Sequence, residues 1–400
     1  MTNRISKLQQ LEGLRGTAAV VVLVSHLRRT FFLEEKAWVE SELPYAVSVC
    51  IEAFFDGKFG VWLFWVMSAL VLSLRYHATA DVGQANGLMT SATIRRYPRL
   101  VLPSAASVLI AWILHANGWM THVKLAALLG PEYHPWLASF YQFDPSLFTA
   151  LKSGMYSCFF DYNPEAAYNP VLWSMEVELY GSFFLFGYLT LIGKHPARLL
   201  IYMATLAVVF QLKVHWLNSF VLGAMICDGF VNQERLKRWV PKFVTSSFLF
   251  VVHSRLIAWL LILPVLFLIG LPNFAGVLNL FLSAAVAAYV TVSQPAAGFF
   301  ARRIPVFLGK ISFGLYLIHL PLICSVAYPL YTTFSEYLPV QLASIVSALM
   351  IAALSILGGW VLWFLADRPA IVFSRAVADW LRGDLRKGSP QAIVGPGKLA

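Results

Sequence analysis

Long apolar stretches alternate with short polar connections along almost the whole chain. A helix needs about 20 mostly apolar residues to cross the hydrocarbon core of a bilayer. Ten stretches meet or approach this length, and the fifth and sixth are short and closely spaced. They are, approximately, 14–33, 58–75, 99–118, 170–192, 197–213, 215–231, 247–270, 275–292, 305–330 and 341–366. The pattern predicts an all-α integral membrane protein with about ten transmembrane helices.

Two segments do not fit a simple series of spans. The connection 119–169 is long, rich in aromatic residues and interrupted by turn signals, so we expect it to pack on the membrane or dip into it. The first apolar stretch lacks a small-residue cleavage site, so we expect a retained first span and no secretory signal peptide. We therefore predict one membrane domain over 1–370 and a polar cytoplasmic tail over 371–400.

Composition excludes the other classes of protein. The chain is 59% hydrophobic and 12% charged, whereas soluble domains are about 45–50% apolar and about 25% charged. A soluble protein of this composition could not cover its surface with polar atoms. Disordered and fibrous chains are excluded on the same grounds.

Basic residues are distributed unevenly between the two sides of the predicted membrane. The formal net charge is +10, and a cytoplasmic N-terminus places 23 of the 30 lysines and arginines on the cytoplasmic side. This bias predicts that both termini are cytoplasmic. Since loop anchoring explains the surplus, we expect membrane lipid as a partner and no nucleic acid.

The cysteines do not indicate a metal or redox motif. The four cysteines, Cys50, Cys158, Cys227 and Cys324, have no CxxC spacing. There is also no HExxH motif and no carboxylate cluster, so we expect no metal. Cys50 and Cys158 fall near outer connections, where a disulfide and two free thiols are both compatible with the sequence.

Ionisable side chains inside apolar spans are costly and therefore indicate function. In the first span, Arg15 and His26 are eleven residues apart, which is three turns plus about 20°, so they share one helix face. Their axial separation is roughly 16 Å. This spacing puts a phosphate-binding guanidinium at the cytoplasmic mouth and a general base at depth. Contacts to lipid headgroups and to a neighbouring helix remain the alternative.

The second candidate site is the run Arg95-Arg96-Tyr97-Pro98-Arg99. We expect this run to open the third span at the level of Arg15, with Pro98 starting the helix. Arginines at a helix N-terminus would form an anion site. A positive-inside anchor is the other interpretation.

Two further polar sets interrupt apolar spans. Glu176 and Glu178 lie in the expected outer part of the fourth span and are about 200° apart on a helix. We expect one to face a cavity and the other a partner, unless they form structural ion pairs. Ser312, Tyr316 and His319 recur at i, i+4 and i+7, so they form one stripe that lines a cavity or bonds to another helix.

Six motifs in this order resemble the membrane acyltransferase-3 family, multi-pass O-acyltransferases of sugars and lipids, over about 8–372. The motifs are Leu11-Glu12-Gly13-Leu14-Arg15-Gly16 with His26, Gly60 to Ala69, Arg96-Tyr97-Pro98-Arg99, Trp173 to Glu178, Ser312 to His319, and Asp367-Arg368-Pro369. The chain departs from the family at Glu12, where Asp is common, and at Ala69, where Gly is usual. It also lacks the C-terminal hydrolase-like domain of some members, so we expect the bundle to act alone or with separate glycan-assembly proteins.

The resemblance implies transfer of an acyl group, usually acetyl, from acyl-CoA as co-substrate to a hydroxyl of a glycan, glycolipid or other extracytoplasmic carbohydrate. It assigns coenzyme A binding to Arg15, Arg96 and Arg99, and selects Glu178 over Glu176. His26 is expected as the general base, with Glu178 orienting it or binding the acceptor.

Further roles follow from the same resemblance. His319 is a third catalytic candidate, and Tyr316 and His319 would line the acceptor path or polarise the carbonyl. The remaining candidates for substrate contacts are Glu12, Trp173 and Ser312.

The expected location is a bacterial inner (plasma) membrane. A transporter or flippase of glycans or lipids, without acyl transfer, is the alternative. It would share the buried charges but should not bind acyl-CoA.

Overall fold

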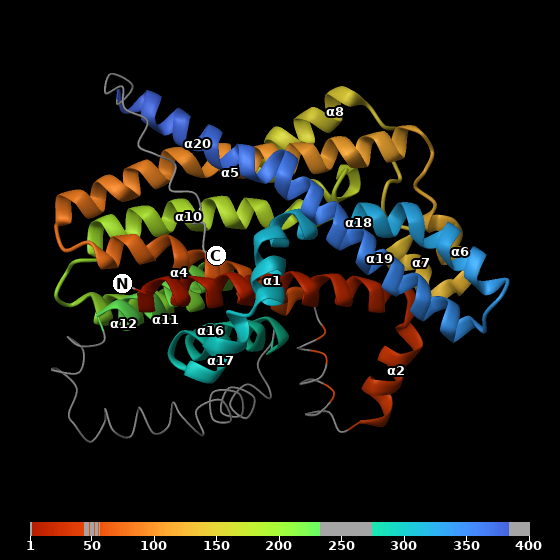
Figure 1. Cartoon of the computed structure of the whole chain (residues 1–400), viewed down its shortest axis with the longest axis horizontal. Coiled ribbons are helices and arrows are strands. Elements are labelled where there is room, and N and C mark those ends of the chain that lie inside the picture. Colours follow the sequence, from red (N-terminus) through yellow and green to blue (C-terminus); the bar gives the residue numbers. More distant parts are fainter. Residues whose placement is uncertain are drawn as a thin grey trace.

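Long helices lie side by side along the long axis of the molecule (Figure 1). The computed structural model describes residues 2–43, 48, 52, 55, 57–232 and 274–383. Every regular element in these ranges is a helix, in agreement with the predicted all-α class. The predicted span 247–270 and Cys50 lie outside the described residues.

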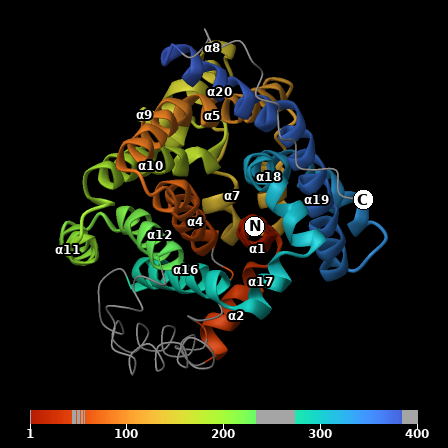
Figure 2. The same ribbon diagram turned by 60° about the vertical axis from the view of Figure 1, so that its left-hand side comes forward.

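The centre of the bundle is α1 (Thr2–Phe31), which packs between α4 (Gly57–Ala78) and α18 (Arg303–Ser335) (Figure 2). Glycines allow the backbones to approach closely. A Cβ at Gly16 would overlap the backbone of Gly309, and a Cβ at Gly314 would overlap the carbonyl of Gly359. Small residues at such crossings are typical of helix packing in membranes.

Further helices surround this centre. α19 (Val340–Leu362) packs on α18, α12 (His215–Val231) packs on α4, and α5 (Val82–Ala116) packs on α10 (Trp173–Ile192). The other helices are α2 (Leu33–Glu42), α11 (Arg198–Gln211), α16 (Phe274–Val292), α17 (Gln294–Phe300) and α20 (Arg368–Leu381), the last joined to α19 through the π-helical turn η5 (Trp363–Asp367).

Five described helices are long and apolar enough to cross a membrane, or six if the pair Gly276–Val292 and Gln294–Phe300, bent by 96°, counts as one span. The five are Gly57–Ala78, Val82–Ala116, Pro170–Ile192, Arg303–Ser335 and Val340–Leu381. The integral membrane class is therefore supported, while the count of ten and the cytoplasmic termini stay predictions. The two short predicted stretches form α11 and α12.

α5 begins at Val82, earlier than the sequence indicated. The Asp81 carboxylate caps it by accepting a hydrogen bond from the Gln84 amide at 2.7 Å. Arg96 is thus fourteen residues, about 21 Å, inside the helix, and Pro98 is also internal. The expectation that Pro98 starts a helix with free amides is wrong. The first turns of α5 carry no apolar run, so the sequence did not mark them, yet they are helical.

The connection 119–169 folds into short helices that pack on the bundle. Leu125, Tyr133 and Leu137 join a core with residues of α1 and α18. These elements are α6 (His122–Leu129), η1 (Pro131–Tyr133), α7 (His134–Leu137), α8 (Leu147–Lys152), η2 (Ser153–Ser157), α9 (Cys158–Phe160) and η3 (Pro164–Ala166), followed by η4 (Pro170–Leu172).

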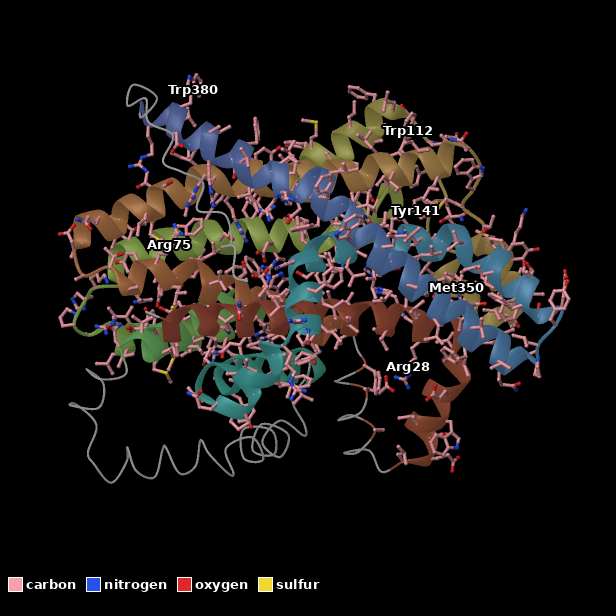
Figure 3. All side chains as sticks on the ribbon, viewed as in Figure 1. Arg28, Arg75, Trp112, Tyr141, Met350 and Trp380 are labelled. Atoms are coloured by element: carbon pink, nitrogen blue, oxygen red, sulfur yellow. The ribbon has the colours of Figure 1, made fainter. Side chains whose placement is uncertain are left out.

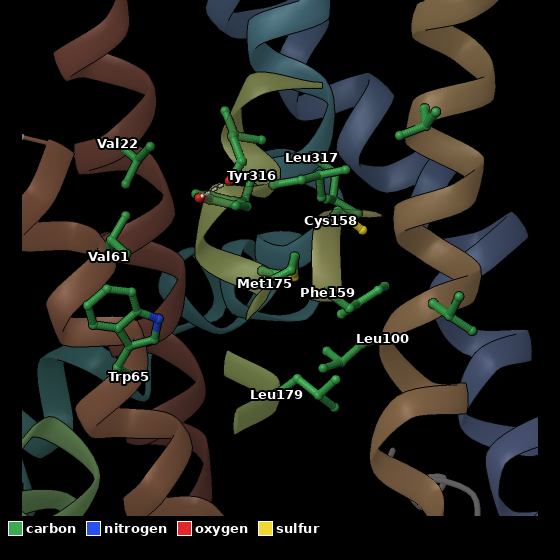
Figure 4. Close-up of a cluster of buried hydrophobic side chains, with 14 of the residues drawn as sticks. Val22, Val61, Trp65, Leu100, Cys158, Phe159, Met175, Leu179, Tyr316 and Leu317 are labelled. Carbon is green, nitrogen blue, oxygen red and sulfur yellow. Dashed lines mark hydrogen bonds between the residues drawn. The ribbon is translucent and has the colours of Figure 1, made fainter. Parts of the chain in front are cut away.

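Most of the largest core cluster lies between α1, α4, α5, α10 and α18 (Figure 4). Cys158, Cys227 and Cys324 are buried thiols, and burial raises the pKa of Cys158 to about 12. In the described part of the chain, no group of three or more His, Cys, Asp or Glu side chains is placed to hold a metal ion.

Candidate active site

Two histidines from distant parts of the chain meet where α1 crosses α18. His319 Nε2 lies 3.0 Å from His26 Nδ1, and the ring centroids are 4.9 Å apart. His319 is only 1% exposed, whereas His26 is half-buried and opens to a cavity.

The hydrogen-bond partners assign the tautomers of both rings. His26 Nδ1 is 3.0 Å from the Val22 carbonyl, and His319 Nδ1 is 3.2 Å from the Leu315 carbonyl. A carbonyl oxygen only accepts, so each Nδ1 carries the hydrogen. His319 Nε2 is then a bare acceptor for the Nδ1–H of His26. The Nε2 of His26 is left without a hydrogen, and this is the form that a general base requires.

His26 lines a cavity of about 430 Å³, which we call the outer cavity after the side on which the sequence predicts His26. Aromatic residues from separate elements form much of its wall, and they include Trp136, Phe140, Tyr162 and Trp173. The Trp136 ring stacks on His26 at 5.8 Å, and the Arg29 guanidinium lies 4.9 Å from the Trp136 ring. Tyr162 donates to the Pro170 carbonyl at 2.9 Å, and burial raises the pKa of its hydroxyl to about 12. The cavity also carries the charged residues Lys58 and Glu165.

Arginines line a second, inner cavity of about 250 Å³, where Arg15, Arg96 and Arg99 meet Ser68 and Glu178. Arg96 forms an ion pair with Glu178, and the Ser68 hydroxyl donates to the same carboxylate at 2.5 Å. Arg99 pairs with Asp367 at 2.6 Å.

Val61 and Tyr316 line both cavities and so form the wall between them. The Tyr316 hydroxyl donates to the Val171 carbonyl at 2.7 Å and lies 2.8 Å from the Ser174 hydroxyl. Trp65, on the inner side, meets Trp173, on the outer side, edge to face at 5.9 Å. Side chains that line both cavities thus separate an arginine-lined cavity from one lined by His26.

The structure distributes most of the predicted site residues between the two cavities. Arg15 opens into the inner cavity and His26 into the outer one, although both lie on α1. His319 contacts His26 directly, and Tyr316 forms part of the wall between the cavities. Trp173 lines the outer cavity and is 40% exposed.

Glu178 does not meet His26. Helix α10 begins at Trp173 in the outer cavity, and five residues carry the chain about 7.5 Å further, to the level of Arg96. Glu178 therefore pairs with Arg96 and does not orient His26, which corrects that expectation, while its alternative role in binding the acceptor and its side of the membrane stay predictions. Glu176 lines neither cavity.

Ser312 and Glu12 also lie away from both cavities. The buried Ser312 hydroxyl donates to the Gly309 carbonyl at 2.8 Å, and Glu12 packs against the backbone of Gly309. Glu12 thus lies at the contact between α1 and α18, whereas the Ser312 bond lies within α18.

Sequence reasoning missed Trp136 and Ser68. Trp136 lies in an aromatic-rich connection where no periodicity marks one ring over another. Ser68 lies within a recognised motif, and only the fold reveals that its hydroxyl faces Glu178.

Comparison with known proteins matches the chain to an acyltransferase family. A family model described as an acyltransferase domain, acyltransferase-3, matches residues 8–364. The chain is 24% identical over 366 residues to O-acetyltransferase PaAT-1 of Phomopsis amygdali, an alignment that covers 80% of this chain and 73% of that protein. No solved structure matches.

Proposed function

The chain belongs to the acyltransferase-3 family, and on that premise we propose that it transfers an acyl group from cytoplasmic acyl-CoA to a hydroxyl on the other side of the membrane. The acyl group is acetyl, and the acceptor is a glycan, glycolipid or other extracytoplasmic carbohydrate. The proposed location is a bacterial inner membrane, with both termini in the cytoplasm and with separate proteins assembling the glycan.

The observation that carries this proposal is the pair of cavities on either side of Val61 and Tyr316. Guanidinium groups suit an anionic donor in the inner cavity. A bare imidazole nitrogen suits an acceptor hydroxyl in the outer cavity. Two reactants that approach from opposite sides would meet at this wall.

The chemistry follows from these positions. His26 Nε2 removes the proton of the acceptor hydroxyl, whose oxygen forms a bond to the thioester carbon. The carbon–sulfur bond then breaks, and the leaving thiolate takes the proton back from His26. During the step His319 Nε2 accepts the Nδ1–H of His26, which stabilises the imidazolium and fixes its orientation.

The remaining residues serve binding. Arg15, Arg96 and Arg99 bind acyl-CoA, and Glu178 with Ser68 holds Arg96 in place. Trp173 and Trp136 offer aromatic faces to the acceptor. Tyr316 shapes the passage between the two cavities.

The test is turnover by the purified protein in lipid nanodiscs. Acetyl-CoA is added together with a glycolipid extract of the host membrane, and thiol release and acetylated glycolipid are measured. We expect acceptor-dependent thiol release. A transporter or flippase would also have two cavities and a wall, but it would give no thiol release and would not bind acetyl-CoA.

A further inference from the structure

Helix α18 contains two internal prolines, Pro321 and Pro329. Proline has no amide hydrogen, so the carbonyl four residues earlier in the helix loses its usual donor. The two carbonyls belong to Leu317 and Ser325, and both residues are buried. A buried carbonyl without a donor is costly, so each of these carbonyls needs a hydrogen bond from another segment.

Side chains of the connection 119–169 supply both hydrogen bonds. Asn169 Nδ2 donates to the carbonyl that Pro321 leaves open, at 2.8 Å. Thr121 Oγ1 donates to the other carbonyl at 2.9 Å. Tyr141 of the same connection shares the largest core cluster with α18 and is seen near that helix in Figure 3. The connection therefore packs on α18 and bonds to it where the two prolines leave carbonyls open.

Asn169 also reaches a second helix. The other hydrogen of its Nδ2 goes to Ser107 Oγ of α5, at 3.0 Å. A carbonyl only accepts, so the contact with Leu317 fixes which side of the amide carries the nitrogen. The backbone carbonyl of Asn169 accepts from the Leu172 amide at 3.1 Å and so starts η4. One residue that is 1% exposed thus ties α5, α18 and η4 together.

The elements that Asn169 joins carry the wall and the histidine pair. Leu317 directly follows Tyr316 of the wall. His319, which contacts His26, comes two residues later. Helix η4 supplies the backbone carbonyl that accepts the Tyr316 hydroxyl at 2.7 Å. Asn169 itself lines neither cavity, so any effect on the site passes through these neighbours.

We propose that Asn169 is a positioning residue for the histidine pair. Its bond to α18 holds the turn 316–319 in the orientation at which His319 meets His26. A helix bends most readily at a proline, so the turn before Pro321 is a part of α18 that depends on an outside bond. This role rests on the proposed function, because turnover is one of its readouts.

Thr121 offers a matched control. It makes the same kind of bond at Ser325, six residues beyond His319. Among the described residues of α18, none beyond Leu320 lines either cavity. Loss of the Thr121 bond should therefore lower stability and leave turnover unchanged, whereas loss of the Asn169 bonds should lower both.

The experiment compares Asn169→Leu with Thr121→Val by steady-state kinetics in nanodiscs and by thermal unfolding in detergent. Each replacement keeps the approximate shape of the side chain and removes its donor. Both variants should unfold at a lower temperature than wild type. Only Asn169→Leu should lose kcat, about tenfold, with an unchanged KM for acetyl-CoA because the arginines of the inner cavity are untouched. If Asn169→Leu does not fold, Asn169→Ser gives the same comparison, since its hydroxyl is too short to reach both acceptors.

Pro321→Ala provides a rescue. It returns an amide hydrogen to the helix, and this hydrogen can bond to the Leu317 carbonyl. The loss of kcat caused by Asn169→Leu should then shrink from about tenfold to about twofold in the Pro321→Ala background. Because the kcat ratio is taken within each background, a direct effect of Pro321→Ala cancels.

Nitrogen-15 NMR of protein labelled at histidine follows the pair without turnover. The resonance of an imidazole nitrogen depends on whether it carries, accepts or lacks a hydrogen. His319→Gln identifies the signals of the pair. Asn169→Leu should move the His26 Nδ1 signal as the bond to His319 weakens, and Thr121→Val should leave that signal in place.

Three results would overturn the positioning role. They are wild-type kcat in Asn169→Leu, an equal loss of kcat in Thr121→Val, and an undiminished loss in the Pro321→Ala background.

The histidine signals separate this inference from the proposed function. A moved His26 signal in Asn169→Leu, without acyl transfer by the wild type, would sustain the positioning role and refute the enzyme. Acyl transfer with kcat and signals unchanged in Asn169→Leu would do the reverse.

Discussion

His26 and His319 are 293 positions apart in the sequence, yet His319 Nε2 lies 3.0 Å from His26 Nδ1. Each Nδ1 also faces the carbonyl one turn earlier in its own helix. This arrangement leaves the Nε2 of His26 without a hydrogen, and under the proposed function it makes His26 the base and His319 a positioning residue.

Replacing His319 should affect turnover more than binding. In His319→Leu the Nδ1–H of His26 loses the imidazole acceptor and keeps only the Val22 carbonyl, so we expect kcat to fall about tenfold to hundredfold, with KM nearly unchanged. In His319→Gln the amide oxygen can accept the same hydrogen and should restore part of kcat. Steady-state kinetics check this, and equal losses in the two variants would contradict a positioning role.

Trp136 should contribute to the outer cavity through its ring. Trp136→Ala removes the stacking on His26, and we expect acceptor kcat/KM to fall about threefold to tenfold, because ring stacking contributes about 0.5–1.5 kcal/mol. Trp136→Phe keeps an aromatic face and serves as the matched control. A Trp136→Ala enzyme with the wild-type kcat/KM would show that the stacking has no role.

Arg96 and Glu178 should be energetically coupled. Their side chains are 12% and 13% exposed, so removing one partner leaves a nearly buried charge uncompensated. A double-mutant cycle of Arg96→Gln and Glu178→Gln, measured by thermal unfolding in detergent, should give a coupling of about 2 kcal/mol. Additive effects of the two substitutions would contradict the ion pair.

The close approach of α1 and α18 should not tolerate a methyl group. In Gly16→Ala the new Cβ would overlap the backbone at Gly309, so we expect a loss of stability of about 1–3 kcal/mol. Separation of the helices should also lower kcat. Gly87→Ala, in α5, is the matched control, because its Cβ meets no atom within 4 Å. If both variants unfold at the wild-type temperature, this packing is not as described.

Sequence patterns predicted the helical class well, because apolar length and composition depend on each segment alone. The start of α5 was missed because its first turns carry no apolar run. Only Ala85 and Met89 are buried there, and the neighbouring residues are mostly polar. The sequence alone did not predict how the helices lie relative to one another. Arg15 and His26 were placed on one face, but only Val61 and Tyr316, from other helices, separate their surroundings into two cavities.

The same limit applies to Glu178. Its motif was recognised, yet its partner depends on the depth at which α5 carries Arg96. Because the helix begins at Val82 and not near Arg96, Arg96 lies deep in the helix, at the level of the Glu178 carboxylate. The contact between His26 and His319 likewise required the crossing of α1 and α18.

In the proposed mechanism His26 is the base for acyl transfer across the wall. The direct measurement is acceptor-dependent release of thiol from acetyl-CoA by wild type and His26→Ala in nanodiscs, with His195→Ala as the exposed histidine control. We predict that His26→Ala lowers kcat at least about hundredfold while coenzyme A still binds, and that His195→Ala matches wild type. Turnover by His26→Ala at the wild-type rate would contradict the account.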